Sequence, residues 1–130
     1  MKDMKNVNEI IHKYLLNDSL RVCLVEAFFK NKVVMIKDIN KYRGVGKSTV
    51  MKALANECDL YIFTNSHFYE YKNKITRLND LRGRRMKYIL LDYMAMTEKQ
   101  AKNTIDKIRS YGVIPIGFLE VVNNKDLELK

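Results

Sequence analysis

Proline occurs once and glycine only five times in this chain of 130 residues. The chain contains no internal repeat, no low-complexity tract and no linker rich in proline, glycine or serine, so separate domains joined by a flexible linker are not expected. Apolar residues make up 47% of the sequence, which is enough for one core. We therefore expect a single domain over residues 1–130, in which residues 1–31 form an N-terminal helical segment.

Long apolar runs are also missing. No run approaches the roughly eighteen apolar residues of a membrane span. The first ten residues, MKDMKNVNEI, lack the apolar segment of a signal peptide. These absences predict a cytoplasmic protein without a membrane partner.

Residues that commonly bind structural metals are scarce. The two cysteines, Cys23 and Cys58, lie far apart and match no zinc-binding spacing, so we expect both to be buried thiols in a reducing compartment. The two histidines, His12 and His67, match no ligand spacing either, and surface or capping roles are expected for them. The cysteines and histidines therefore indicate no metal site of their own.

Basic residues outnumber acidic ones. Lysine and arginine contribute 24 residues and aspartate and glutamate 15, which gives a net charge of +9. This charge favours polyanionic partners such as nucleotides, DNA or RNA. A lysine-rich surface that mainly gives solubility is the alternative explanation.

Apolar spacing predicts alternating helices and strands. Two helices are expected before residue 31, and the second, over residues 20–29, is apolar enough to be packed on both sides. Pro115 indicates that the last strand is an edge strand or contains a bulge. The expected strands cover 32–38, 59–66, 86–93 and 113–122, and the expected later helices cover 47–57, 67–81 and 97–112. This alternation predicts an α/β fold with a mostly parallel sheet of about four strands.

The stretch KYRGVGKSTV, residues 41–50, joins a predicted strand to a predicted helix. Gly44 and Gly46 permit a tight turn whose backbone N–H groups surround an anion. Lys47 is placed to reach the β- and γ-phosphates of a nucleotide, and the Ser48 hydroxyl is placed to bind Mg²⁺. A glycine-rich turn with a solvated lysine is the alternative explanation.

The loop residues RGVGKS, 43–48, resemble the Walker A loop of P-loop NTPases and are similar to those of phage terminase and packaging ATPases. Lys41 stands where the family has its first glycine, a position that closes the base of the loop. The resemblance implies a three-layer P-loop NTPase-like fold that binds ATP and Mg²⁺. It implies nucleotide contacts from Arg43, Gly44, Val45, Gly46, Lys47, Ser48 and Thr49.

A second motif is the apolar strand KYILLDY, which ends near Asp92 and resembles a Walker B strand. The resemblance implies that Asp92 and Ser48 hold Mg²⁺ and that Lys47 and Asp92 are the catalytic residues. A strand-end aspartate in an ordinary turn is the alternative.

The residue after Asp92 departs from the family. Hydrolases of this type have a glutamate there that polarises the attacking water, whereas this chain has Tyr93, which cannot act as that base. Glu98 and Glu120 are acidic candidates from elsewhere in the chain. Hydrolysis is therefore expected to be slow, partner-dependent or absent.

The segment LRGRR, residues 81–85, is similar to stretches that precede Walker B in some phage terminase and helicase-like ATPases, so the resemblance covers residues 32–93. Arg82, Arg84 and Arg85 are candidates for binding nucleic-acid phosphate or for reaching the nucleotide of a neighbouring subunit. An exposed turn is the alternative.

Together these features predict an ATP-binding P-loop protein of a phage or mobile element that acts on DNA or RNA. The alternative is a non-catalytic adaptor that engages DNA or a host replication or defence protein. A small-molecule phosphotransferase is a third and less favoured option, because such a chain needs residues for a lid. A protein partner and homo-oligomerisation both stay open.

Overall fold

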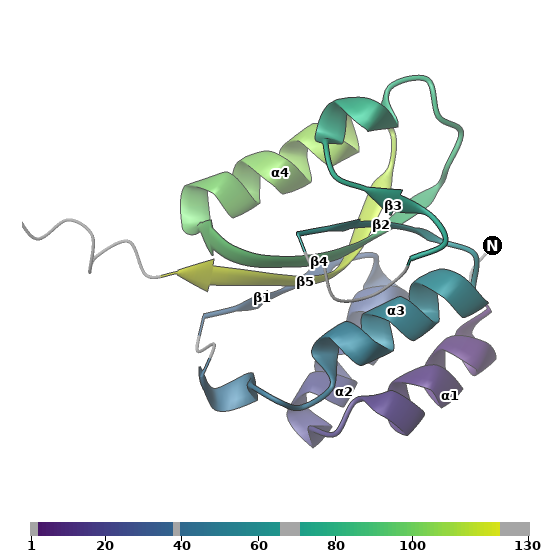
Figure 1. Cartoon of the computed structure of the whole chain (residues 1–130), viewed down its shortest axis with the longest axis vertical. Coiled ribbons are helices and arrows are strands. Elements are labelled where there is room, and N and C mark those ends of the chain that lie inside the picture. The colour runs from purple at the N-terminus through teal and green to yellow at the C-terminus, as the bar shows by residue number, and fades with distance from the viewer. Residues whose placement is uncertain (1–2, 38–39, 66–70, 123–130) are drawn as a thin grey trace, which may run out of the picture.

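The computed structural model describes residues 3–37, 40–65 and 71–122, which form a parallel sheet between two helical layers (Figure 1). The strand order is β1-β5-β4-β2-β3, and all the neighbouring strands pair in parallel. The strands are β1 (Val33–Ile36), β2 (Tyr61–Thr64), β3 (Lys74–Ile75), β4 (Tyr88–Thr97) and β5 (Ile114–Val122). The prediction of an α/β fold with a parallel sheet is confirmed, with one short strand more than expected.

Three helices cover one face of the sheet and a fourth covers the other (Figure 1). Successive residues of a strand point to opposite faces. Leu90 and Phe118 accordingly join the core under α1–α3, whereas Leu91 and Leu119 join the core under α4. The helices are α1 (Met4–Tyr14), α2 (Asp18–Lys30), α3 (Lys47–Glu57) and α4 (Glu98–Ser110). None of these described helices has the length and apolar character that crossing a membrane requires.

The second N-terminal helix begins at Asp18, two residues before the predicted start, because the Asn17 side chain accepts a hydrogen bond from the Leu20 N–H and caps α2. The prediction that this helix is packed on both sides is wrong. Val22 and Phe29 are 67% and 77% exposed. Cys23, on the same helix, is exposed rather than buried, and Cys58 is only half-buried.

The prediction of a helix over residues 67–81 is wrong for the part of this segment that the structure describes. Residues 71–81 contain β3 and the 3₁₀ helix η2 (Leu78–Leu81) instead. Ile75 and Leu81 bury their side chains in the core under α4, so a strand and a turn place them as well as a helix would. The prediction for His67 lies outside the described residues.

Of the two alternatives that Pro115 indicates, the edge strand is wrong, because β5 lies between β1 and β4. The β4–β5 pairing does contain a register shift, but it lies between Tyr93 and Met96, and Pro115 itself pairs in register with Ile89. The N–H of Ile114 donates to the Lys87 carbonyl on the β4 side, so the Pro115 nitrogen faces the β1 side. Pairing with β1 starts only at Gly117. Proline therefore costs this central strand no ladder hydrogen bond.

The last helix lies within the predicted range of 97–112. Thr97 and Gln100 form a capping box at the start of α4. Gly112 follows the end of α4 with a φ of 77°, the left-handed conformation that glycine adopts without strain. A capping box therefore determines where this helix begins, and a glycine follows its end.

Candidate functional site

The glycine loop lies between β1 and α3. The 3₁₀ helix η1 (Asn40–Tyr42) contains Lys41, residues 43–46 form a turn, and α3 begins at Lys47. Gly44 and Gly46 have φ angles of 74° and 88°, which are left-handed conformations that favour glycine. The predicted strand–turn–helix context of the loop is confirmed.

The N-terminal helices hold this loop in place. A Cβ atom at Gly46 would lie 2.3 Å from the Tyr14 carbonyl oxygen at the end of α1. The N–H of Leu16 donates to the Val45 carbonyl at 2.8 Å. Gly46 is therefore required by packing as well as by its backbone angles, a reason that the motif alone does not reveal.

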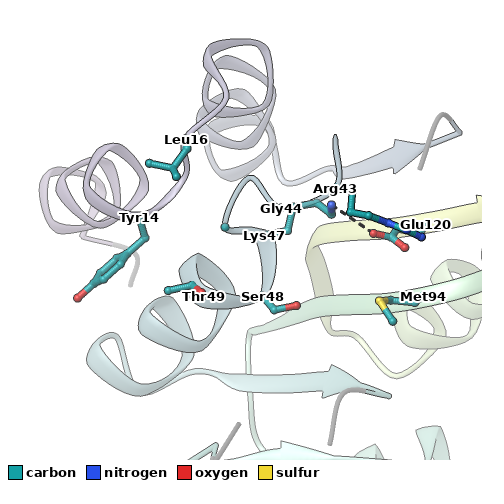
Figure 2. Close-up of a pocket in the computed structure, with 10 residues that line it drawn as sticks. Tyr14, Leu16, Arg43, Gly44, Lys47, Ser48, Thr49, Met94 and Glu120 are labelled. Atoms are coloured by element: carbon teal, nitrogen blue, oxygen red, sulfur yellow. Dashed lines mark ion pairs between the residues drawn. The ribbon is translucent and has the colours of Figure 1, made fainter. Parts of the chain in front are cut away.

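Lys47 points its ammonium group at two internal acceptors. Its Nζ donates to the Tyr42 carbonyl. The same Nζ lies 3.4 Å from the Glu120 Oε1, and Figure 2 shows this ion pair. The Lys47 and Glu120 side chains are only 12% and 9% exposed. Glu120 is thus part of the site, although the sequence motif does not single it out.

Ser48 and Asp92 meet beneath the loop. The Ser48 side chain hydrogen-bonds Asp92, and Asp92 is 5% exposed. The Asp92 Oδ2 has no hydrogen-bond partner among the described residues. The structure therefore brings together the two residues that the sequence assigns to Mg²⁺.

Burial raises the pKa of Asp92 to about 6, because a charged carboxylate loses its hydration there. The hydrogen bond from Ser48 lowers the pKa, the negative charge of Glu120 raises it, and the positive charge of Lys47 lowers it. Above this pH the carboxylate is mostly ionised, and a buried negative charge costs free energy unless a cation lies beside it.

The Ser48–Asp92 pair fits Mg²⁺ on chemical grounds. A hydroxyl and a carboxylate are hard oxygen ligands of the kind that Mg²⁺ prefers. A buried carboxylate oxygen without a partner costs free energy that a bound cation would recover. Mg²⁺ usually keeps several waters and takes substrate phosphates as further ligands, so two protein ligands are sufficient.

A pocket of about 660 Å³ opens over the loop (Figure 2). This volume lies within the usual range for small-molecule sites. The lining residues come from the glycine loop, from the α1–α2 connection and from β4 and β5: Tyr14, Leu16, Arg43, Gly44, Gly46, Lys47, Ser48, Thr49, Met94 and Glu120. Six of the seven loop residues assigned to the nucleotide line it, and Val45 does not.

The arginine segment lies at the opposite end of the sheet. In a parallel sheet all strands begin at one end, and Arg82, Arg84 and Arg85 precede β4, whereas the glycine loop follows β1. Arg84 donates to the Asp80 carbonyl at 2.7 Å and to the Tyr61 hydroxyl at 3.3 Å. These arginines are exposed and do not approach the glycine loop of their own chain.

The other polar candidates lie outside the site. Glu98 is exposed and pairs with Lys37 at 3.0 Å. His12 is exposed on α1, as expected. Within residues 3–37, 40–65 and 71–122, no three His, Cys, Asp or Glu side chains gather as a metal-binding group.

No protein-family model, curated protein or solved structure matches this chain. The function is therefore inferred from the sequence of this chain and from its site.

Proposed function

We propose that this chain binds ATP together with Mg²⁺ on the loop of residues 43–49. The triphosphate would occupy the pocket over Gly44 and Gly46, where backbone N–H groups and the start of α3 favour an anion. Lys47 would exchange its two internal acceptors for phosphate oxygens. Resemblance to the Walker A loop and the geometry of the pocket support the same ligand.

The observation that carries the proposal is the buried Asp92 Oδ2, which has no hydrogen-bond partner in the described part of the chain, on a side chain that hydrogen-bonds Ser48. In the absence of a ligand, an aspartate in this position destabilises the protein. Such a cost is typical of functional sites, where a buried charge is held ready for a cation. Ser48 and Asp92 would bind Mg²⁺, and the metal would neutralise phosphate charge.

The charges around the loop predict that the metal is required. Lys47 and Arg43 contribute two positive charges to the site, and Asp92 and Glu120 contribute two negative charges. The protein alone therefore offers a polyphosphate little net attraction. Mg²⁺ supplies the missing positive charge.

The proposal includes an action on nucleic acid. The net charge of +9 and the exposed Arg82 and Arg85 favour a polyanion at the end of the sheet opposite the loop. A cytoplasmic location and an origin in a phage or mobile element are part of the same proposal. The phage or mobile-element origin rests on the resemblance, and the cytoplasmic location rests on the lack of long apolar runs in the sequence.

Calorimetric titration with ATP and with GTP, each in the presence and absence of Mg²⁺, tests this proposal. We expect saturable binding of at least one nucleoside triphosphate that depends on Mg²⁺. Absence of binding by both nucleotides would contradict it. The comparison of ATP with GTP also determines the base preference. The sequence leaves this preference open, since it lacks the guanine-specific Asn-Lys-x-Asp motif.

A non-catalytic adaptor is the second candidate, and the outer face of α2 favours it. Val22 and Phe29 are exposed there and border an apolar hollow of about 510 Å³. Capture of a partner protein that is unaffected by Lys47→Ala would favour the adaptor function. Capture that requires bound ATP would favour a nucleotide-dependent function.

A further inference from the structure

The position after Asp92 cannot supply the catalytic carboxylate in this fold. β4 continues to Thr97, so Tyr93 points to the opposite face of the sheet from Asp92. There the Tyr93 ring stacks on Phe63, with ring centroids 4.7 Å apart. A glutamate at position 93 would therefore face α4 and not the glycine loop.

The neighbouring strand places a different carboxylate at the loop. Asp92 lies opposite Phe118 on β5, and Phe118 packs on the α1–α3 face. Glu120 is two residues further along β5, on the same face, and lies opposite Ile36, the last residue of β1. Glu120 thus lies level with the end of β1, the strand that precedes the glycine loop.

The Glu120 carboxylate lies beside the Lys47 ammonium, the group that would hold the terminal phosphate of ATP. Its Oε1 lies 3.4 Å from the Lys47 Nζ, and it lines the pocket over the loop. In a phosphate loop the lysine ammonium contacts the β- and γ-phosphates. A carboxylate that touches this ammonium lies about one water molecule away from the γ-phosphate.

We propose that Glu120 is the carboxylate that activates water for ATP hydrolysis, in place of the residue after Asp92. This inference rests on the proposed function, because it requires ATP on the loop. When phosphate takes over the Lys47 ammonium, the Glu120 carboxylate is released from its ion pair and accepts a hydrogen bond from a water molecule.

The reaction then balances in one displacement. The water oxygen forms a bond to the γ-phosphorus, and Glu120 accepts the proton that this water loses. The bond between the γ-phosphorus and the β,γ-bridging oxygen breaks, and its electron pair leaves with ADP. Lys47 stabilises the charge that develops on the phosphate oxygens.

The test is single-turnover hydrolysis of γ-labelled ATP with the full chain in excess, combined with calorimetry. Glu120→Gln keeps the shape of the side chain but cannot accept the proton, so phosphate release should fall about 100-fold or more. Its affinity for ATP and Mg²⁺ should be unchanged or higher. The matched control is Glu98→Gln, which should release phosphate at the original rate.

A shortened acid separates the chemical role from the positioning of Lys47. Glu120→Asp keeps a proton acceptor and should release phosphate at a rate between the original protein and Glu120→Gln. Equal losses in both variants would overturn the assignment. So would unchanged release by Glu120→Gln, or no release by the original protein.

Calorimetry distinguishes this inference from the proposed function. If the original protein binds ATP but the hydrolysis results go against Glu120, only the role of Glu120 fails. If the original protein binds no nucleotide, the proposed function fails and the role of Glu120 fails with it.

Discussion

Lys47 and Glu120 form a buried ion pair, in which the lysine Nζ lies 3.4 Å from the glutamate Oε1. The cation best placed to bind phosphate is thus paired with a carboxylate when no ligand is present. A buried pair of this kind contributes little net stability, but the loss of one member leaves the other charge uncompensated. When ATP binds, its phosphate would replace the Glu120 carboxylate as the partner of the Lys47 ammonium.

The first prediction concerns Lys47→Ala. We expect ATP affinity to weaken by about 2–4 kcal/mol, because a charged hydrogen bond in a desolvated site is lost. Calorimetry measures this change. The control is Lys102→Ala on the exposed side of α4, which removes the same charge far from the loop and should leave the affinity nearly unchanged. Equal affinities for all three proteins would show that Lys47 does not contact the ligand.

The second prediction concerns the stability of the protein without ligand. The pKa of Asp92 is about 6 in the folded state and 3.8 in the reference state, so the folded protein binds the proton more tightly. Stability from this group is fully present below pH 3.8 and is lost as the pH rises to about 6. At pH 7.5, Asp92→Asn should therefore raise the free energy of unfolding by about 2–3 kcal/mol, as measured with urea. A loss of stability at pH 7.5 would contradict this account.

The third prediction concerns the pH dependence of binding. Mg²⁺ requires the ionised form of Asp92, so affinity for ATP with Mg²⁺ should fall as the pH drops below about 6. The measurement is calorimetry at several pH values between 5 and 8. Because ATP itself titrates in this range, the matched reference is Asp92→Asn, which should bind more weakly and respond less to pH. Parallel pH profiles for the two proteins would rule out Asp92 as the responsible group.

The fourth prediction separates the two loop glycines. Gly44 has open space around it, so Gly44→Ala should cost only the left-handed backbone strain of about 1–2 kcal/mol. At Gly46, a Cβ atom would also collide with the Tyr14 carbonyl, so Gly46→Ala should cost clearly more. Urea unfolding compares the two variants. Equal stability losses would mean that α1 does not support the loop.

The fifth prediction concerns the arginine segment. The double variant Arg82→Ala, Arg85→Ala should weaken binding of single-stranded oligonucleotides, and the slope of log affinity against log salt should decrease by about 1 for each lost phosphate contact. ATP affinity should not change, because these residues lie at the other end of the sheet. The charge-matched control is Lys99→Ala, Lys102→Ala. A similar effect of both double variants would show that oligonucleotide binding depends on net charge alone and not on these arginines.

The sequence predicts helices and strands well where a short local pattern is sufficient to determine them. The Thr97–Gln100 capping box and the apolar runs of β4 and β5 determine local structure through short-range contacts, and the structure contains them. The 67–81 segment shows the limit, because spacing of three to four residues also suits β3 followed by η2. Only the tertiary core under α4 decides between these alternatives.

In the candidate site too, some residues could be predicted from the sequence, whereas the contacts between distant residues could not. The loop and Asp92 follow from sequence, since the loop follows one apolar strand and Asp92 follows the apolar run of another. The partnership of Lys47 with Glu120 does not, because it depends on β5 lying between β1 and β4. No spacing within the chain encodes that strand order, and the support of Gly46 by Tyr14 is equally non-local.

The central claim is that Asp92 and Ser48 hold a metal with which ATP binds, and the most direct test is the Mg²⁺ dependence of ATP affinity. Calorimetry of the original protein and of Asp92→Asn, each with Mg²⁺ and with a chelator, measures it. The account predicts tight binding only for the original protein with Mg²⁺. Binding that is equally tight without Mg²⁺, or in Asp92→Asn, would contradict it.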